Sequence, residues 1–76
     1  MESSAGKTAP TGLILPYGGH SPEIAGDVYI APGAAVIGDV VIGEGSSIWF
    51  NTVVRGDFNE VRIGRRSNIQ DGVVIH

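Results

Sequence analysis

The chain has 76 residues, of which 42% are apolar and 17% charged, and its formal net charge at pH 7 is −3. This length allows one small domain of ordinary soluble composition. The acidic balance argues against a nucleic acid partner, because phosphate binding needs clustered Lys and Arg. Since the chain has no cysteine, any metal site would need His and carboxylate ligands.

The first residues lack the basic and apolar stretches of a secretory signal, and no apolar run is long enough to span a membrane. We therefore expect a cytoplasmic protein without a membrane partner. Residues 1–11 show no repeating pattern, which predicts a flexible N-terminal tail. Residues 12–76 are expected to form a partial β-helix domain, in which residues 13–15 make a lead-in strand. The Gly and Pro residues of segment 16–22 then predict a loop, with His20 at the surface.

An aliphatic residue recurs at every sixth position. The positions are Ile24, Ile30, Val36, Ile42, Ile48 and Val54, followed after a three-residue slip by Ile63, Ile69 and Ile75. Three places after eight of these, all but Arg66 are Gly, Asn or Asp, the types that tolerate a positive φ at a corner. A helix repeats at 3.6 residues and a strand at 2, so neither explains a corner at every sixth residue. The period predicts an all-β fold, the parallel β-helix of hexapeptide repeats.

Successive hexads divide the chain into triangular coils. Residues 24–41 and 42–59 would form the first two coils, and residues 63–76 begin a third, so we expect a β-helix truncated after about two and a half coils. Repeat folds generally need about three units and a cap, which favours a fragment or an open end that a partner covers. The slip predicts that residues 58–62 project from a corner as a small loop.

Arg55 and His76 occupy the same outward position of the hexad on the same side of the triangle. Parallel strands lie about 4.8 Å apart, so we expect these side chains to be neighbours. A His beside a permanent cation is disfavoured as imidazolium and is therefore able to bind a metal. One His is not a catalytic zinc site, however, and a lone outward His is more often a surface residue.

Two strings are more specific than the period: the triplet Arg55-Gly56-Asp57, and Asn68-Ile69-Gln70-Asp71-Gly72 followed by His76. The coil opening Ile30-Ala31-Pro32-Gly33-Ala34 accompanies them. Together they closely resemble the γ-class carbonic anhydrase family over about residues 22–76. The resemblance implies a left-handed β-helix and a homotrimer, in which Arg55 and Asp57 form salt bridges across subunits and Asp71 supports the interface network.

The same resemblance implies an active site between subunits. Gln70 and Asn68 would lie near the metal-bound water as catalytic residues, and His76 would be the first of three histidines that bind zinc, or iron or cobalt. The other two histidines of the family lie further along, in an H-x-x-x-x-H string beyond His76. The metal site is therefore expected to be incomplete in this chain.

The expected reaction is the reversible hydration of carbon dioxide to bicarbonate by the complete trimer. Zinc on three neutral imidazoles lowers the pKa of bound water to about 7, which gives the attacking hydroxide. The founding type of the family carries a glutamate after the Arg-Gly-Asp string, whereas this chain has Phe58 and a shorter loop. Proton export would need other groups, with Glu60 the only nearby acid, and the 76 residues alone are expected to be inactive.

Two other hypotheses stay open. A hexapeptide acyltransferase would use an outward His as general base toward a hydroxyl or amine. A non-catalytic trimeric scaffold would keep Arg55 and Asp57 but lack the downstream histidines. Either Trp49 or Phe50 should face outward, where a neighbouring subunit could cover it.

Overall fold

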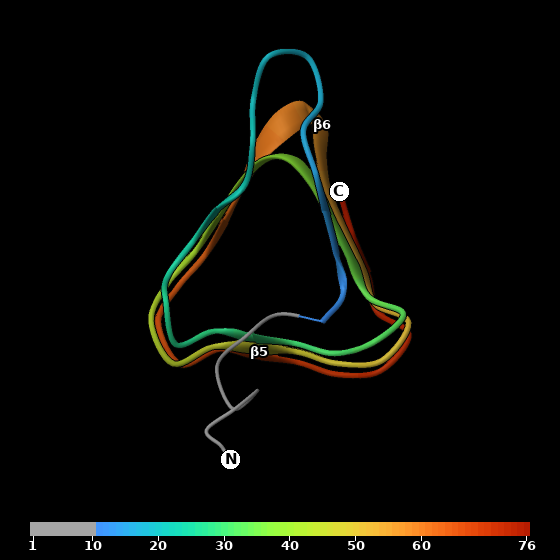
Figure 1. Ribbon diagram of the computed structural model, residues 1–76. Helices are drawn as coiled ribbons and strands as arrows, with labels where there is room; N and C mark the ends of the chain where they lie inside the picture. Colours follow the sequence, from blue (N-terminus) through green and yellow to red (C-terminus); the bar gives the residue numbers. More distant parts are fainter. Residues whose placement is uncertain (1–10) are drawn as a thin grey trace.

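The computed structural model describes residues 11–76. Every regular element in this range is a β-strand. The strands are β1 (Leu13–Leu15), β2 (Glu23–Ile24), β3 (Tyr29–Ile30), β4 (Ala35–Ile42), β5 (Ser47–Ile48), β6 (Val53–Ile63), β7 (Asn68–Ile69) and β8 (Val74–Ile75). The chain winds in triangular coils stacked along one axis (Figure 1). This is the parallel β-helix that the six-residue period predicts.

Strands of successive coils pair in parallel, and each side of the triangle is a small sheet. One side consists of β3, β5 and β7, and a second of β1, β8 and the first halves of β4 and β6. The second halves of β4 and β6 continue around a corner and form the third side with β2. No helix between residues 11 and 76 is long and apolar enough to cross a membrane.

The predicted aliphatic positions form the core. Five of them are completely buried, or nearly so: Ile30, Val36, Ile42, Ile48 and Val54. Ile63 is 9% exposed, and Ile24, Ile69 and Ile75 are half-buried members of the same cluster. Burial of one such side chain contributes about 1.5–3 kcal/mol. The core therefore follows directly from the period of the sequence.

Two buried polar side chains, Ser46 and Thr52, connect one coil to the next. The Ser46 hydroxyl donates to the carbonyl oxygen of Gly64 at 2.9 Å and accepts the Ser67 N–H at 3.0 Å. The Thr52 hydroxyl donates to the carbonyl oxygen of Gln70 at 2.7 Å. Because both hydroxyls have partners, they occupy the core without the penalty of an unsatisfied polar group.

The corners agree with the predicted column at five of its eight positions. Positive φ values occur there at Gly33, Gly45, Asn51, Arg66 and Gly72. Arg66 takes a φ of 54° although it is not a typical corner residue, so the position in the coil imposes the conformation. The prediction of positive φ is wrong at the three Asp positions. Asp27 instead accepts a 2.9 Å hydrogen bond from the N–H of Gly45 in the next coil, and the corner before Asp39 uses Gly38, with a φ of 80°.

We call the corner formed by residues 16–22, 38–39 and 57–60 the apex. Gly38 pairs with Gly56 and Val40 with Val61, so residues 57–60 stand where β4 has only Asp39. The prediction that residues 58–62 project as the loop is wrong by one position at its start and two at its end, because residues 61 and 62 have already returned to the sheet. The orange ribbon beside the β6 label marks this segment (Figure 1).

The first described residues are hydrogen-bonded to the first coil at the N-terminal end of the β-helix. The predicted tail, residues 1–11, lies outside the described part except for Thr11. Its backbone N–H and hydroxyl both donate to the carbonyl oxygen of Ile30, at 2.9 and 3.0 Å, and the Leu13 N–H donates to Ala34 at 2.9 Å. Thr11 therefore belongs to the end of the β-helix and satisfies carbonyl groups of the first coil.

Candidate functional site

The outer surface of β1, β4, β6 and β8 carries predominantly apolar side chains beside the predicted site. We call this surface, with residues 13–15, 35–37, 53–55 and 74–76, the β8 face. Leu13, Ala35, Val53 and Val74 stand side by side in register and point outward, because the alternate residues point into the core. Leu13 and Val74 are 60% and 59% exposed. Ala35 and Val53, between them, are half-buried, and such an apolar row is typical of a surface that another protein covers.

His76 follows directly after β8 on the same face. The register of β6 with β8 pairs Val53 with Val74 and Val54 with Ile75. Continuing that register by one residue aligns the exposed His76 with Arg55. Their proximity and the role of His76 as a metal ligand stay predictions.

Arg55 is paired with Asp57 within the chain. The Arg55 Nη2 and Nε atoms donate to Asp57 Oδ2 at 2.6 and 3.2 Å. These hydrogen bonds from the guanidinium hold the pKa of the Asp57 carboxyl below its ordinary value, so Asp57 is ionised at neutral pH. The structure therefore brings the two predicted interface residues together, while their salt bridge across subunits stays a prediction.

Gly56 stands between them because no larger residue fits. A Cβ atom at this position would collide with the backbone of Asp39 in the preceding coil. The glycine of the Arg-Gly-Asp string is thus explained by close approach of two coils.

The outer surface of β3, β5 and β7 carries a second polar group, centred on Asn68. We call this surface, with residues 29–31, 47–49 and 68–70, the β7 face. The Asn68 Oδ1 atom accepts hydrogen bonds from Trp49 Nε1 at 2.6 Å and from the Ser47 hydroxyl at 2.7 Å. The Trp49 ring also packs against Tyr29, with ring centroids 5.0 Å apart.

Sequence reasoning did not find Ser47 and Trp49 as partners of Asn68. The available signal was the repeat itself, since one coil plus the three-residue slip separates Ser47 from Asn68. These two residues are register partners where β5 pairs with β7. The expectation that one of Trp49 and Phe50 faces outward is met by both residues. Trp49 follows the inward Ile48 and lies half-buried on the β7 face, and Phe50, at the next corner, is 42% exposed.

Gln70 and Asp71 follow β7 at the corner that leads to β8. Both are exposed, and the Gln70 carbonyl group is held by the Thr52 hydroxyl. Gln70 lies two residues after Asn68, so the alternation along a strand places both on the β7 face. The proposed catalytic amides therefore lie on one face, and His76 lies on the next, around the corner at residues 71–73.

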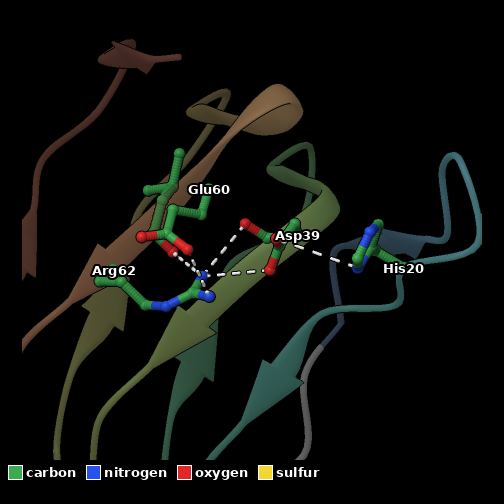
Figure 2. A network of polar contacts seen from close by, with 5 residues as sticks. His20, Asp39, Glu60 and Arg62 are labelled. Carbon is green, nitrogen blue, oxygen red and sulfur yellow. Dashed lines mark hydrogen bonds and ion pairs between the residues drawn. The ribbon is translucent and has the colours of Figure 1, made fainter.

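A polar network beside the apex includes Glu60, the acid near the position where the founding type of the family has its glutamate. Arg62 is bound to Glu60 and to Asp39, each at 3.1 Å, and His20 Nδ1 lies 3.9 Å from the other oxygen of Asp39 (Figure 2). Glu60 is therefore already engaged by a cation. His20 is 62% exposed, as predicted for a surface loop.

The described residues supply only one candidate metal ligand at the predicted site. Between residues 11 and 76, no three His or carboxylate side chains converge in a way that could hold a metal ion. This part of the chain also encloses no pocket. His76 fits one position of a shared site, and the other ligands and the walls of such a site would have to come from another copy or from residues outside this range.

The profile of the bacterial transferase hexapeptide family (six repeats) matches residues 21–56. Among curated proteins, the carbonic anhydrase of Geobacillus kaustophilus is 53% identical over 64 residues, which are 84% of this chain and 35% of the relative. The mitochondrial γ carbonic anhydrase 2 of Arabidopsis thaliana is 54% identical over 56 residues, or 74% of this chain and 20% of the relative. The uncharacterized transferase YtoA of Bacillus subtilis is 53% identical over 64 residues, which are 84% of this chain and 37% of the relative.

A solved structure of similar sequence has the same fold. It is a Bacillus cereus protein provisionally named an acetyltransferase, with a TM-score of 0.77 and 41% identity over 83% of this chain and 42% of that chain. The chain thus spans only about a fifth to two fifths of the proteins that it matches here, and their names include both carbonic anhydrase and transferase.

Proposed function

Because this chain belongs to the γ-carbonic anhydrase-like family of hexapeptide-repeat proteins, we propose that the complete protein is a homotrimeric, metal-dependent carbonic anhydrase. The reaction is the reversible hydration of carbon dioxide to bicarbonate. His76 is one metal ligand, Asn68 and Gln70 contact the reacting groups, and Arg55, Asp57 and Asp71 support the interface. Since the chain spans 35% of the Geobacillus relative, these statements concern the complete protein.

The observation that carries this proposal is the division of the site residues between two faces. The amides of Asn68 and Gln70 belong to the β7 face, whereas His76 and Arg55 belong to the β8 face. These groups act on one substrate only if the β7 face of one copy meets the β8 face of the next. Contacts of this head-to-tail kind form a closed ring when the rotation from one copy to the next closes, and we propose such a cyclic oligomer here.

The apolar surface supports the same arrangement. Leu13, Val53 and Val74 form an aliphatic row on the β8 face, and Tyr29 and Trp49 provide aromatic surface on the β7 face. Aromatic and aliphatic side chains are common in the buried centre of protein interfaces. Closing the two faces on each other would also enclose the site, which the single chain leaves open.

Zinc is the proposed cofactor, with iron or cobalt as the alternatives. When bound, such a metal supplies Lewis-acid activation of a water molecule. The residues of this chain provide the rest: the His76 imidazole donates a ligand nitrogen, and the Asn68 and Gln70 amides orient the reacting groups by hydrogen bonding. The Arg55–Asp57 pair fixes the guanidinium beside His76.

The test replaces His76 by Ala in the complete protein, with His20→Ala as the matched control at the exposed apex. We expect His76→Ala to lose bound metal and to reduce kcat/KM for carbon dioxide hydration by about a hundredfold or more. Loss of a residue that only supports a metal ligand typically costs less, about ten- to a hundredfold. His20→Ala should retain both. Metal content and stopped-flow hydration rates are the measurements, and equal metal content and activity in His76→Ala would refute the proposal.

A second candidate, a hexapeptide acyltransferase, is favoured by the names of the matching family and of two similar proteins. In that function an outward His would act as a general base. Acetyl-coenzyme A should then protect the complete protein against thermal unfolding, and bicarbonate should not. A trimer that responds to neither and binds no metal would support a scaffold instead.

A further inference from the structure

We infer that Ser47 and Trp49 are positioning residues, which turn the Asn68 side chain so that its NH₂ group faces outward and selects an anionic oxygen ligand. The inference deepens the proposed function and rests on it, since Asn68 is there a residue that contacts the substrate. Neither Ser47 nor Trp49 needs to touch the substrate. Their effect is to decide which end of the Asn68 amide is available.

The orientation of the amide follows from the chemistry of the indole ring. The Nε1–H group of tryptophan can only donate a hydrogen bond. The Asn68 atom that lies 2.6 Å from Trp49 Nε1 must therefore be the acceptor, Oδ1, and not the amide nitrogen. This argument fixes an assignment that the shape of a carboxamide alone leaves open.

The Ser47 hydroxyl completes the arrangement. It donates to the same Asn68 oxygen at 2.7 Å and accepts the Trp49 indole N–H at 2.9 Å. The carboxamide oxygen thus has two donors for its two lone pairs. What Asn68 offers to a ligand is its Nδ2 group, which carries two N–H donors.

Ser47 and Asn68 of this network lie on strands β5 and β7, and Trp49 follows β5 directly. Ser47 and Asn68 are a register pair between β5 and β7. The Trp49 backbone N–H donates to the Ile69 carbonyl at 2.9 Å. The Trp49 ring lies against the rings of Tyr29 and Phe50, at centroid distances of 5.0 and 6.0 Å. A site on strands holds its geometry better than one on loops.

A fixed N–H donor distinguishes the two sides of the reaction. Carbon dioxide is neutral and a weak acceptor, whereas bicarbonate carries a negative charge on its oxygens. A donor that is already oriented stabilises charge as it develops on oxygen and needs no reorganisation at that moment. We therefore assign Asn68 to the bicarbonate oxygens, with Ser47 and Trp49 as the residues that enforce this.

The kinetic test uses Asn68→Asp in the complete, metal-loaded protein. The carboxylate keeps an oxygen for Trp49 and Ser47 but replaces the outward donor by an acceptor. We expect the KM for bicarbonate to rise roughly ten- to a hundredfold, the effect of losing a hydrogen bond to a charged group. Asn59→Asp adds the same charge in the apex loop and should leave this KM unchanged. Trp49→Phe and Ser47→Ala should raise it about three- to tenfold, and Ser47→Thr should restore it.

A second readout is independent of activity. Trp49 is the only tryptophan among the 76 residues, so Trp49→Phe identifies its indole N–H signal in a ¹H–¹⁵N spectrum. We expect slow exchange of this proton with water in the wild type and in Asn68→Asp, and exchange faster by about tenfold in Asn68→Ala.

The two readouts separate the possible failures. Fast indole exchange in the wild type would overturn the orientation, whatever the activity. Slow exchange with an unchanged bicarbonate KM in Asn68→Asp would overturn the selection of an anion by Asn68. A metal-loaded wild type without hydration activity would refute the proposed function. In that case, titration of the protein with bicarbonate, followed by its amide signals, would test whether Asn68 selects an anion. An affinity for bicarbonate in Asn68→Asp equal to that of the wild type would overturn this selection.

Discussion

The hydroxyl of Thr52 donates a 2.7 Å hydrogen bond to the main-chain carbonyl of Gln70, one coil further along. Thr52 is completely buried, so this bond connects the core of the β-helix to a residue of the candidate site. The position belongs to the column of small side chains between the inward aliphatic residues. A residue of the repeat thereby supports the backbone of a proposed catalytic amide.

We expect Thr52→Val, which keeps the shape of the side chain, to destabilise the protein. The Gln70 carbonyl group would lose its hydroxyl donor in a partly buried environment and keep only the 3.4 Å contact with the Val73 N–H, at a cost of about 0.5–1.5 kcal/mol. Thr52→Ser is the matched control, since it removes a methyl group and keeps the hydroxyl. The free energy of unfolding in urea is the measurement, and a smaller loss for Val than for Ser would contradict this role of the hydroxyl.

Gly56→Ala is predicted to be destabilising through a backbone collision. The added Cβ atom would meet the Asp39 backbone, so the two coils would have to separate, at a cost of about 1–3 kcal/mol or more. Gly26→Ala is the control, because no atom lies within 4 Å of the Cβ site at Gly26. The midpoint of thermal unfolding should fall for Gly56→Ala and not for Gly26→Ala. Equal midpoints for the two variants would refute the close approach of the coils.

Arg66→Gly should raise stability. Arg66 has a φ of 54°, and a non-glycine residue in this conformation costs roughly 1–2 kcal/mol. The hydrogen bond from its backbone N–H to the Glu44 carbonyl, 2.7 Å long, does not depend on the side chain and should remain. Arg65→Gly, one residue earlier and without positive φ, should lower stability. Chemical denaturation of both variants tests the sign, and a less stable Arg66→Gly protein would show that its side chain contributes more than the strain costs.

The six-residue period was sufficient to predict the fold, its core and five of the eight corner positions, because the same columns of residues recur from coil to coil. Ile48 is buried and Arg66 has a positive φ for that single reason. The position of the apex loop was less predictable. The period gives the length of the slip, but the return to the sheet depends on the pairing of Val40 with Val61, which only the folded register shows.

The candidate site was predictable in part. The string around Asn68 identified the residue, but not the direction in which its amide points. That direction depends on Trp49 and Ser47, whose side chains reach Asn68 through the stacking of coils. The division of the predicted site between two faces likewise follows from the three-dimensional winding, and the strings themselves give no sign of it.

The Arg55–Asp57 pair predicts a specific pH dependence of stability. The guanidinium lowers the pKa of Asp57 in the folded state, so the unfolded chain binds a proton at this site at higher pH than the folded chain does. The pair therefore stabilises the fold above the unfolded pKa of about 3.9, and this contribution is lost as the pH falls through the lower folded value. Asp57→Asn should lower the thermal midpoint at pH 7, and the difference from wild type should shrink progressively below about pH 4.

Arg55→Met is the matched variant from the other side of the pair. Without the guanidinium, the pKa of Asp57 should return toward its ordinary value, so this variant should also lose the stabilisation at neutral pH and converge with wild type in acid. The double variant separates the pair from each single change, because the effects of two residues in direct contact are not additive. If the two single losses simply add at pH 7, the hydrogen bonds between Arg55 and Asp57 contribute nothing to stability.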